Sequence, residues 1–218
     1  MARLKTGVLI SGSGTNLQAL LDAAVAPDYP AEIALVISNT SGAFGLQRAK
    51  SAEVPTEIID HKEFPTRQAF DQALDARLRE AGIEQVCLAG FMRILTPEFV
   101  DLWRDRLINI HPSLLPAFKG LDAQAQALAA GVRIAGCTVH FVRPEMDSGP
   151  IIVQGAVPVL DGDDVEALSA RILEIEHRIY PLALRLIGEG KVTVDGDTVH
   201  IRGADGDGVL ISPPPAGG

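Results

Sequence analysis

The chain has 218 residues, of which 47% are hydrophobic and 22% charged, a composition typical of a globular enzyme. At this length a single large domain is the default arrangement. The formal net charge of −9 disfavours a nucleic-acid partner, because nucleic acids usually bind a basic face.

The sequence shows no sign of export or membrane insertion. No apolar run reaches the length of a membrane span, and the N-terminus lacks an apolar stretch of signal-peptide length. Cys87 and Cys137 lie in apolar runs with no His or Cys at metal-ligand spacing, so we expect buried, reduced thiols. We therefore expect a cytoplasmic protein with no membrane partner.

In the first half of the chain, short apolar runs alternate with helical segments. The expected strands cover Thr6–Ile10, Ile33–Ile37, Pro55–Asp60, Gln85–Ala89 and Leu107–Ile110. The expected helices cover Thr15–Ala24, Ala43–Ala52, Thr66–Ala81 and Pro97–Trp103. In the third helix, Phe70, Leu74 and Leu78 recur at four-residue spacing. Strands that alternate with helices form βαβ units, which predicts a mostly parallel sheet covered on both faces.

The pattern changes after about Gly120. Two strand-like runs, Ile134–Val142 and Pro150–Val159, follow each other without a helix between them, which suits a wide hairpin and a mixed end to the sheet. A long helix is expected from about Asp163 to Ile187. Pro181 should kink it, because proline cannot donate to the carbonyl one turn earlier and crowds that group.

The last predicted elements are a small hairpin and a tail. Lys191–Ile201 is expected to pair with itself around a turn at Asp195-Gly196, and Ser212–Gly218 to be disordered. The predicted fold class is therefore α/β, with an open, twisted, mostly parallel sheet, helices on both faces and a small C-terminal hairpin. We expect residues 1–204 to form a single domain and residues 205–218 a flexible tail.

Gly12 and Gly14 lie between the first strand and the first helix, where a dinucleotide could bind. The dinucleotide motif fails, because its third glycine would fall on Leu17 and Ser38-Asn39 occupies the place of its acidic residue. A P-loop is also excluded, since no Gly-Lys-Ser/Thr follows. What remains is a short turn that leads into a helix.

Such a turn suits one phosphate monoester. The start of a helix offers free backbone N–H groups, and here Thr15 and Asn16 add a hydroxyl and an amide in the first turn. The alternative is a tight turn that the glycines permit, in which Thr15 only caps the helix.

Asn109 and His111 form a second polar pair, at the end of the fifth strand. Residues two apart on a strand project to the same side, and Pro112 keeps His111 extended. Ligands of open α/β sheets bind at the carboxyl ends of strands, so the pair supports a catalytic hypothesis. The alternative is a histidine whose hydrogen bonds are satisfied by a backbone carbonyl.

A carboxylate would orient His111 and favour its charged form. The loop between the two later strands offers Asp147, with Glu145 as the other candidate. No Ser or Cys is placed as an activated nucleophile. The other histidines are scattered, without metal-ligand spacing: His61, His140, His177 and His200. We therefore expect direct transfer between two bound substrates, without a metal.

The polar groups belong to motifs that closely resemble the phosphoribosylglycinamide formyltransferase family of folate-dependent enzymes. In chain order these motifs are ISGSGTN (10–16), LAGFMRIL (88–95), NIHPSLLPAFKG (109–120), GCTVHFV (136–142), DSGP (147–150) and EHRIYP (176–181). The resemblance extends from Thr6 to about Lys191. It implies a Rossmann-like fold and transfer of the formyl group of 10-formyltetrahydrofolate, as a co-substrate, to the amine of glycinamide ribonucleotide in purine biosynthesis.

The resemblance also implies roles for single residues. Gly14, Thr15 and Asn16 would hold the phosphate of the ribonucleotide, and Glu176 would contact its ribose or glycinamide. The alternative for Glu176 is a carboxylate on the flank of the helix, paired with Arg178 or solvent. In the folate site, Met92, Arg93, Ile94 and Leu95 would line the pterin pocket, largely through backbone groups. The other folate-binding residues would be Arg67, Asn109, Val142 and Met146. Without the resemblance, the two arginines would equally suit solvated positions.

In the implied mechanism the substrate amine attacks the formyl carbon. Protonated His111 and the amide of Asn109 would bind the developing oxyanion, and Asp147 would keep His111 charged and aligned. The sequence departs from many relatives at Ala123 and Gln124, near a helix start, where Thr and His are common.

Several related activities remain as alternatives. The nearest is formyltetrahydrofolate deformylase, which passes the formyl group to water and usually carries an extra N-terminal domain. Methionyl-tRNA formyltransferase needs a tRNA-binding domain and a basic surface, and a sugar N-formyltransferase is a weaker option. From a different class, a non-catalytic phosphate-binding sensor domain would explain the glycine turn alone. We expect a monomer or homodimer that acts on small-molecule substrates.

Overall fold

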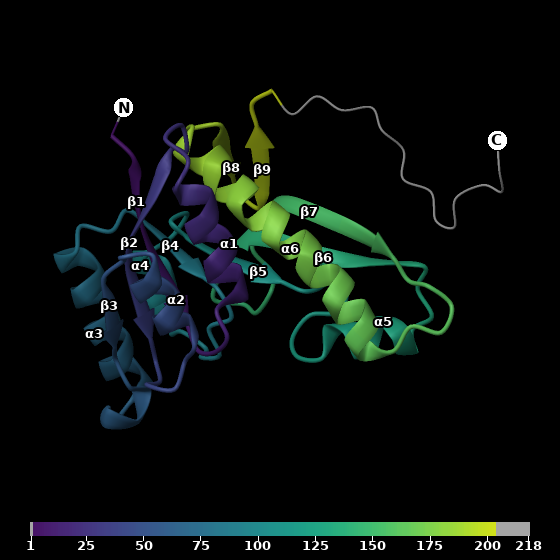
Figure 1. Cartoon of the computed structure of the whole chain (residues 1–218), viewed down its shortest axis with the longest axis horizontal. Coiled ribbons are helices and arrows are strands. Elements are labelled where there is room, and N and C mark those ends of the chain that lie inside the picture. The colour runs from purple at the N-terminus through teal and green to yellow at the C-terminus, as the bar shows by residue number, and fades with distance from the viewer. Residues whose placement is uncertain (1, 204–218) are drawn as a thin grey trace.

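The computed structural model describes residues 2–203, which form one open sheet of seven strands covered by helices, and a separate hairpin (Figure 1). The sheet strands are β1 (Leu4–Ile10), β2 (Ala31–Ser38), β3 (Thr56–Ile58), β4 (Gln85–Leu88), β5 (Leu107–His111), β6 (Ile134–Phe141) and β7 (Ile151–Pro158). The hairpin consists of β8 (Val192–Asp195) and β9 (Thr198–Ile201). The helices are α1 (Thr15–Ala24), α2 (Gly45–Ser51), α3 (Arg67–Glu80), α4 (Pro97–Leu102), α5 (Ala123–Ala129) and α6 (Val165–Gly188), with one 3₁₀ turn, η1 (His61–Glu63).

The sheet is parallel through its first five strands and antiparallel at its end, as predicted. Its strand order is β3-β2-β1-β4-β5-β6-β7. All neighbours from β3 to β5 pair in parallel, whereas β5 with β6 and β6 with β7 pair antiparallel. The order reverses between β1 and β4, which makes the carboxyl ends of these two strands the place where an open α/β sheet binds ligands.

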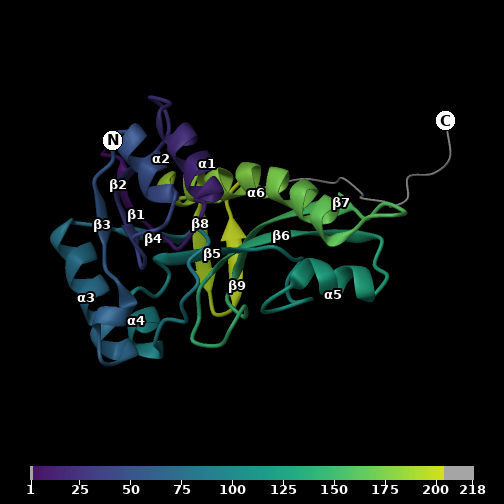
Figure 2. The same ribbon diagram turned by 60° about the horizontal axis from the view of Figure 1, so that its bottom comes forward.

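Both faces of the sheet are covered, which explains why the strands read as continuous apolar runs. One core contains Val8 and Ile10 of β1 together with the inner faces of α1, α2 and α6. The other contains Leu9 of β1 together with α3 and α4. Figure 2 shows α1, α2 and α6 on one side of the sheet and α3 and α4 on the other. Cys87 and Cys137 are buried free thiols, as expected.

The predicted third strand and second helix each extended two residues too far at one end. The third strand ends at Ile58, not at Asp60, because the Asp60 side chain accepts a hydrogen bond from Lys62 N at 2.9 Å and starts η1. The second helix begins at Gly45, not at Ala43, because the Gly45 N–H donates to the carbonyl of Gly12 at 3.0 Å across the neighbouring loop.

The later elements agree with the predicted order. Helix α6 continues without a break through Pro181 to Gly188. The bend expected at Pro181 stays a prediction. The predicted tail, 205–218, lies outside the described residues. No helix within residues 2–203 has the length and apolar character needed to cross a membrane.

Candidate active site

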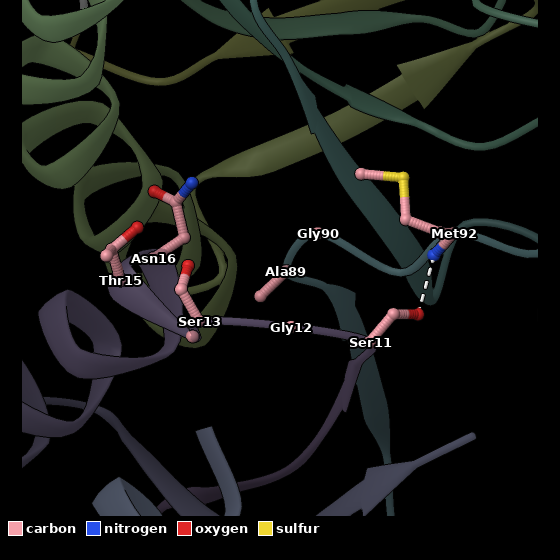
Figure 3. A pocket seen from close by; sticks show the side chains of 9 residues that line it. Ser11, Gly12, Ser13, Thr15, Asn16, Ala89, Gly90 and Met92 are labelled. Atoms are coloured by element: carbon pink, nitrogen blue, oxygen red, sulfur yellow. Dashed lines mark hydrogen bonds between the residues drawn. The ribbon is translucent and has the colours of Figure 1, made fainter. Parts of the chain in front are cut away.

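The loop after β1 forms a cavity at the reversal point of the sheet (Figure 3). The cavity measures about 200 Å³ and is lined by Ser11, Gly12, Ser13, Gly14, Thr15, Asn16, Ala89, Gly90 and Met92. Helix α1 starts here without an acidic residue in its first turn. Because the first N–H groups of a helix lack intrahelical acceptors, this end of α1 can bind an anion.

Gly14 ends the turn in the left-handed conformation, with φ 69° and ψ 33°. It is the N-cap residue, and no side chain caps α1, so the interpretation of Thr15 as a mere helix cap is wrong. The backbone of Gly14 packs directly on Gly45, since a Cβ on Gly14 would lie 2.6 Å from the Gly45 Cα. Arg48 donates from Nε to the carbonyl of Ser13 at 2.9 Å and brings a positive charge to the turn.

Asn16 is linked to the long C-terminal helix. Its Nδ2 donates to Oε2 of Glu176 at 2.7 Å, and its Oδ1 is buried without a partner among the described residues. Burial raises the pKa of Glu176, while the Asn16 hydrogen bond acts in the opposite direction. Glu176 is only 7% exposed, so the alternative of a surface carboxylate paired with Arg178 is wrong.

A second polar cluster lies beside the carboxyl end of β5. His111 Nδ1 is 3.6 Å from Asp147 Oδ2, and Asn109 Nδ2 is 3.4 Å from His140 Nε2. His140 Nε2 is in turn 3.9 Å from Asp147 Oδ1. The structure therefore brings Asn109, His111 and Asp147 together, with His140 between the amide and the carboxylate.

Both nitrogens of His111 face oxygen atoms. Nε2 is 2.9 Å from the carbonyl of Phe118, while Nδ1 faces Asp147. The carbonyl contact agrees with the alternative of a satisfied histidine, and the carboxylate contact agrees with the catalytic hypothesis. The Nε2 contact is a hydrogen bond, whereas the 3.6 Å between Nδ1 and Asp147 Oδ2 is too long for one and fits an electrostatic contact only.

Asp147 reaches this cluster from the loop between β6 and β7. Its backbone is left-handed, with φ 49°, and its Oδ2 accepts a hydrogen bond from Gly120 N at 2.8 Å. Glu145, the other carboxylate considered for this position, is exposed. The loop thus presents one acid to His111.

His140 was counted among the scattered histidines without metal-ligand spacing, and its place beside Asn109 and Asp147 was not predicted. It stands opposite Asn109 in the antiparallel pair of β5 and β6, so both side chains lie on one face. Its Nδ1 is 3.0 Å from the carbonyl of Phe141, and burial lowers its pKa. A neutral His140 that donates from Nδ1 has Nε2 free to accept from Asn109.

The residues assigned to folate, which we call the donor rim, come from the start of α3 (Arg67), the loop after β4 (92–95), β5 (Asn109) and the loop after β6 (Val142 and Met146). Arg67 is exposed at the start of α3, and Arg93 is half-buried in the loop after β4. Large apolar side chains on the rim are exposed: Met92 (72%), Ile94 (60%) and Met146 (54%). Leu95 is instead buried in the core beneath α3 and α4, and Val142 packs against that core while partly exposed. Within residues 2–203 no group of three His, Cys, Asp or Glu could hold a metal, and the metal-free route stays a prediction.

The fold is that of a formyl-group transferase. The chain belongs to the formyl transferase family, whose sequence profile matches residues 4–184, and is an enzyme of that class. It is similar to phosphoribosylglycinamide formyltransferase of Haemophilus influenzae, with 42% identity over 91% of this chain and 94% of that protein. It is also similar to the crystal structure of glycinamide ribonucleotide transformylase 1 from Symbiobacterium toebii, with a TM-score of 0.89, 53% identity, and coverage of 91% and 94%.

A third relative is much longer than this chain. The trifunctional purine biosynthetic protein adenosine-3 of Gallus gallus is 54% identical over 88% of this chain, but over only 19% of its own length. The chain thus spans about a fifth of that relative, and the similarity concerns that part alone.

Proposed function

We propose that this enzyme transfers the formyl group of 10-formyltetrahydrofolate to the amine of glycinamide ribonucleotide, in purine biosynthesis in the cytoplasm. The products are formylglycinamide ribonucleotide and tetrahydrofolate. The observation that carries the proposal is the position of the glycine turn and the Asn109–His111 pair at the carboxyl ends of β1 and β5. Strand β4 lies between them, and its loop lines the same cavity. A phosphorylated acceptor and a donor can therefore meet at one edge of the sheet.

The acceptor would bind with its phosphate at the turn. The N–H groups of Gly14, Thr15 and Asn16 lie at the start of α1, where the helix dipole favours an anion. Glu176, held by Asn16, would accept hydrogen bonds from the ribose or the glycinamide. This assignment fits a phosphate monoester, because the turn offers free N–H groups at a helix start, whereas the glycine pattern of a dinucleotide site is missing.

The transfer step would proceed through a tetrahedral intermediate. The substrate amine attacks the formyl carbon, and the carbonyl oxygen becomes an oxyanion that accepts hydrogen bonds from His111 and from the Asn109 amide. Asp147 balances the imidazolium charge. The amine proton passes, through water or His111, to the folate nitrogen as the carbon–nitrogen bond to the donor breaks. For this donation, His111 must exchange its contact with the Phe118 carbonyl for the substrate oxygen.

The donor would lie along the exposed apolar rim, with its pterin against backbone groups of Met92 to Leu95. The loop from Val142 to Asp147 would close over the pterin. Asn109 would face the donor from β5, and Arg67 would bind at the far end of the donor. Residues 1–204 would form a single catalytic domain, which the continuous seven-stranded sheet and its two cores support.

A turnover assay tests the proposal. The purified protein is supplied with 10-formyltetrahydrofolate, with and without glycinamide ribonucleotide, and product is followed by absorbance. We expect transfer only with the acceptor. Formate release without the acceptor would favour a deformylase, and no turnover in either case would favour a sensor domain.

Variants test the catalytic groups. Loss of one oxyanion donor lowers turnover by about 10²–10³-fold, so Asn109→Ala and His111→Ala should each fall in that range. Asp147→Ala should fall as well, because His111 loses its charge partner. His200→Ala, an exposed histidine of β9, is the matched control and should keep wild-type turnover. Near-normal turnover of any of the three site variants would remove that residue from the mechanism.

A further inference from the structure

Asp71 is a buried carboxylate that the proposed mechanism does not use. It lies inside α3 and is only 3% exposed. Its Oδ2 accepts a hydrogen bond from Thr96 N at 2.7 Å, and its Oδ1 is buried without a partner among the described residues. Thr96 also caps α4, since its hydroxyl accepts from Phe99 N at 3.4 Å. Asp71 therefore joins α3 to the point where the loop after β4 becomes α4.

The loop after β4 is held at both ends by side chains from other elements. At its start, Met92 N donates to Ser11 Oγ at 2.8 Å, a bond drawn in Figure 3. At its end, Thr96 N donates to Asp71. Arg93 and the exposed Ile94 lie between these two anchors. Besides the buried Leu95, one hydroxyl and one carboxylate from other elements thus hold this part of the donor rim.

Two arginines, Arg67 and Arg93, interact electrostatically with the carboxylate of Asp71. Burial raises the pKa of Asp71, while the Thr96 hydrogen bonds and then the charges of Arg67 and Arg93 act to lower it. The Nε of Arg93 is also buried without a partner in the described part of the chain. Unpaired buried polar groups are uncommon in folded proteins, and two of them lie here at the donor rim.

We propose that Asp71 is a positioning residue for the formyl donor. Its carboxylate holds the loop of residues 91–96 against α3 and keeps the guanidinium groups of Arg67 and Arg93 at the rim. This inference rests on the proposed function, from which the donor-binding role of the rim is taken. Asp71 touches neither the acceptor turn nor the β5 cluster, so its loss should weaken binding of the donor and leave the chemical step intact.

Two substitutions separate the roles of hydrogen bonding and charge. Asp71→Asn keeps an oxygen that can accept from Thr96 N but removes the charge, whereas Asp71→Leu removes both. We expect the KM for 10-formyltetrahydrofolate to rise about tenfold in Asp71→Leu and less in Asp71→Asn. The KM for the ribonucleotide and the kcat at saturating donor should stay within about twofold.

Asp75 offers a matched control on the same helix. Its Oδ1 accepts from Trp103 Nε1 at 2.9 Å, so it also fastens α3 to α4, but at the far end of α4 from the donor loop. Asp75→Asn should lower the melting temperature about as much as Asp71→Asn does, and should leave the KM for the donor unchanged. An equal rise of the donor KM in Asp75→Asn would reduce Asp71 to a general structural residue and overturn the proposal.

The pH dependence supplies a readout that a structural role would not move. Because burial raises the pKa of Asp71, its carboxyl takes up a proton at higher pH than a surface aspartate, and the donor KM of the wild type should rise as the pH falls. The other charged groups that face it are arginines, which do not titrate in this range. The ratio of the donor KM in Asp71→Asn to that in the wild type should therefore approach one at low pH.

Direct binding keeps the two proposals apart. Calorimetry with tetrahydrofolate measures the donor site without turnover, and Asp71→Asn is used if Asp71→Leu does not fold. Weaker tetrahydrofolate binding in the variant supports the role of Asp71 even if the wild type transfers no formyl group, a result that would reject only the proposed function. Equal binding by wild type and Asp71→Asn, with an unchanged donor KM, would overturn the inference about Asp71.

Discussion

Gly14 allows the sharpest test of the acceptor turn, because its conformation and its packing both exclude a side chain. A non-glycine residue in the left-handed region costs about 1–2 kcal/mol. An added Cβ would also meet the Gly45 Cα at 2.6 Å, a backbone atom that can move only with α2. Overpacking of this kind costs about 1–3 kcal/mol. Gly14→Ala should therefore lose about 2–5 kcal/mol, a large part of the stability of a typical domain.

Gly12 provides the control, because it lies in the same turn and lines the same cavity. A Cβ at Gly12 would meet no atom within 4 Å, and its φ lies outside the left-handed range. Gly12→Ala should thus change the free energy of unfolding by less than about 0.5 kcal/mol. Urea titration of both variants, with the slope checked against the wild type, measures the difference.

The same pair of variants reports on function. Relief of the contact with Gly45 requires the turn to move away from α2, which displaces the N–H groups at the start of α1. The KM for glycinamide ribonucleotide should therefore rise in Gly14→Ala and change little in Gly12→Ala. Equal unfolding midpoints for the two variants would refute the reasoning, because neither the left-handed strain nor the contact would then be real.

Three other changes have defined outcomes. His140→Leu should lower kcat by about tenfold, because Asn109 loses the acceptor that orients its amide, whereas His140→Gln should recover most of it, measured by steady-state turnover. Glu176→Gln should raise the melting temperature at neutral pH, because the raised pKa of Glu176 makes its folded-state ionisation unfavourable. The gain should disappear as the pH falls below the ordinary value of 4.5, in a thermal melt series. Tyr180→Phe should lower the free energy of unfolding, measured in urea, by about 0.5–1.5 kcal/mol, because the Tyr180 hydroxyl donates to the carbonyls of Leu88 and Ile108.

The sequence predicts best those strands that are buried on both faces of the sheet. Strands β1, β2 and β4 each contain an apolar run whose successive residues enter opposite cores, and these runs predict the strands from the sequence. The turn at Gly14 is also readable, since it joins a buried strand to a helix. By contrast, η1 begins where the Asp60 side chain accepts a hydrogen bond from Lys62 N, and no hydrophobic periodicity predicts that contact.

The site could be predicted only in part. Asn109 and His111 are two residues apart on one strand, so their common side is a local property. His140 joins them through the register of an antiparallel pair, and register is decided by residues far along the chain. Its signal was present, because Thr138 and His140 are polar residues two apart in an otherwise apolar run opposite Asn109. Asp147 reaches His111 from a loop, where its own backbone is left-handed. The resemblance indicates this acid, whereas residue spacing does not.

The bond between Gly120 and Asp147 has a consequence for natural variation in this enzyme. Asp147 is the one member of the cluster that stands on a loop, and its carboxylate is held there by a single N–H from a second loop. A substitution at residues 119–122 can therefore move the Asp147 carboxylate relative to His111 without touching any reacting group. Differences between orthologues at Ala123 and Gln124 should accordingly be compared through the pH dependence of turnover, before they are assigned to substrate contacts.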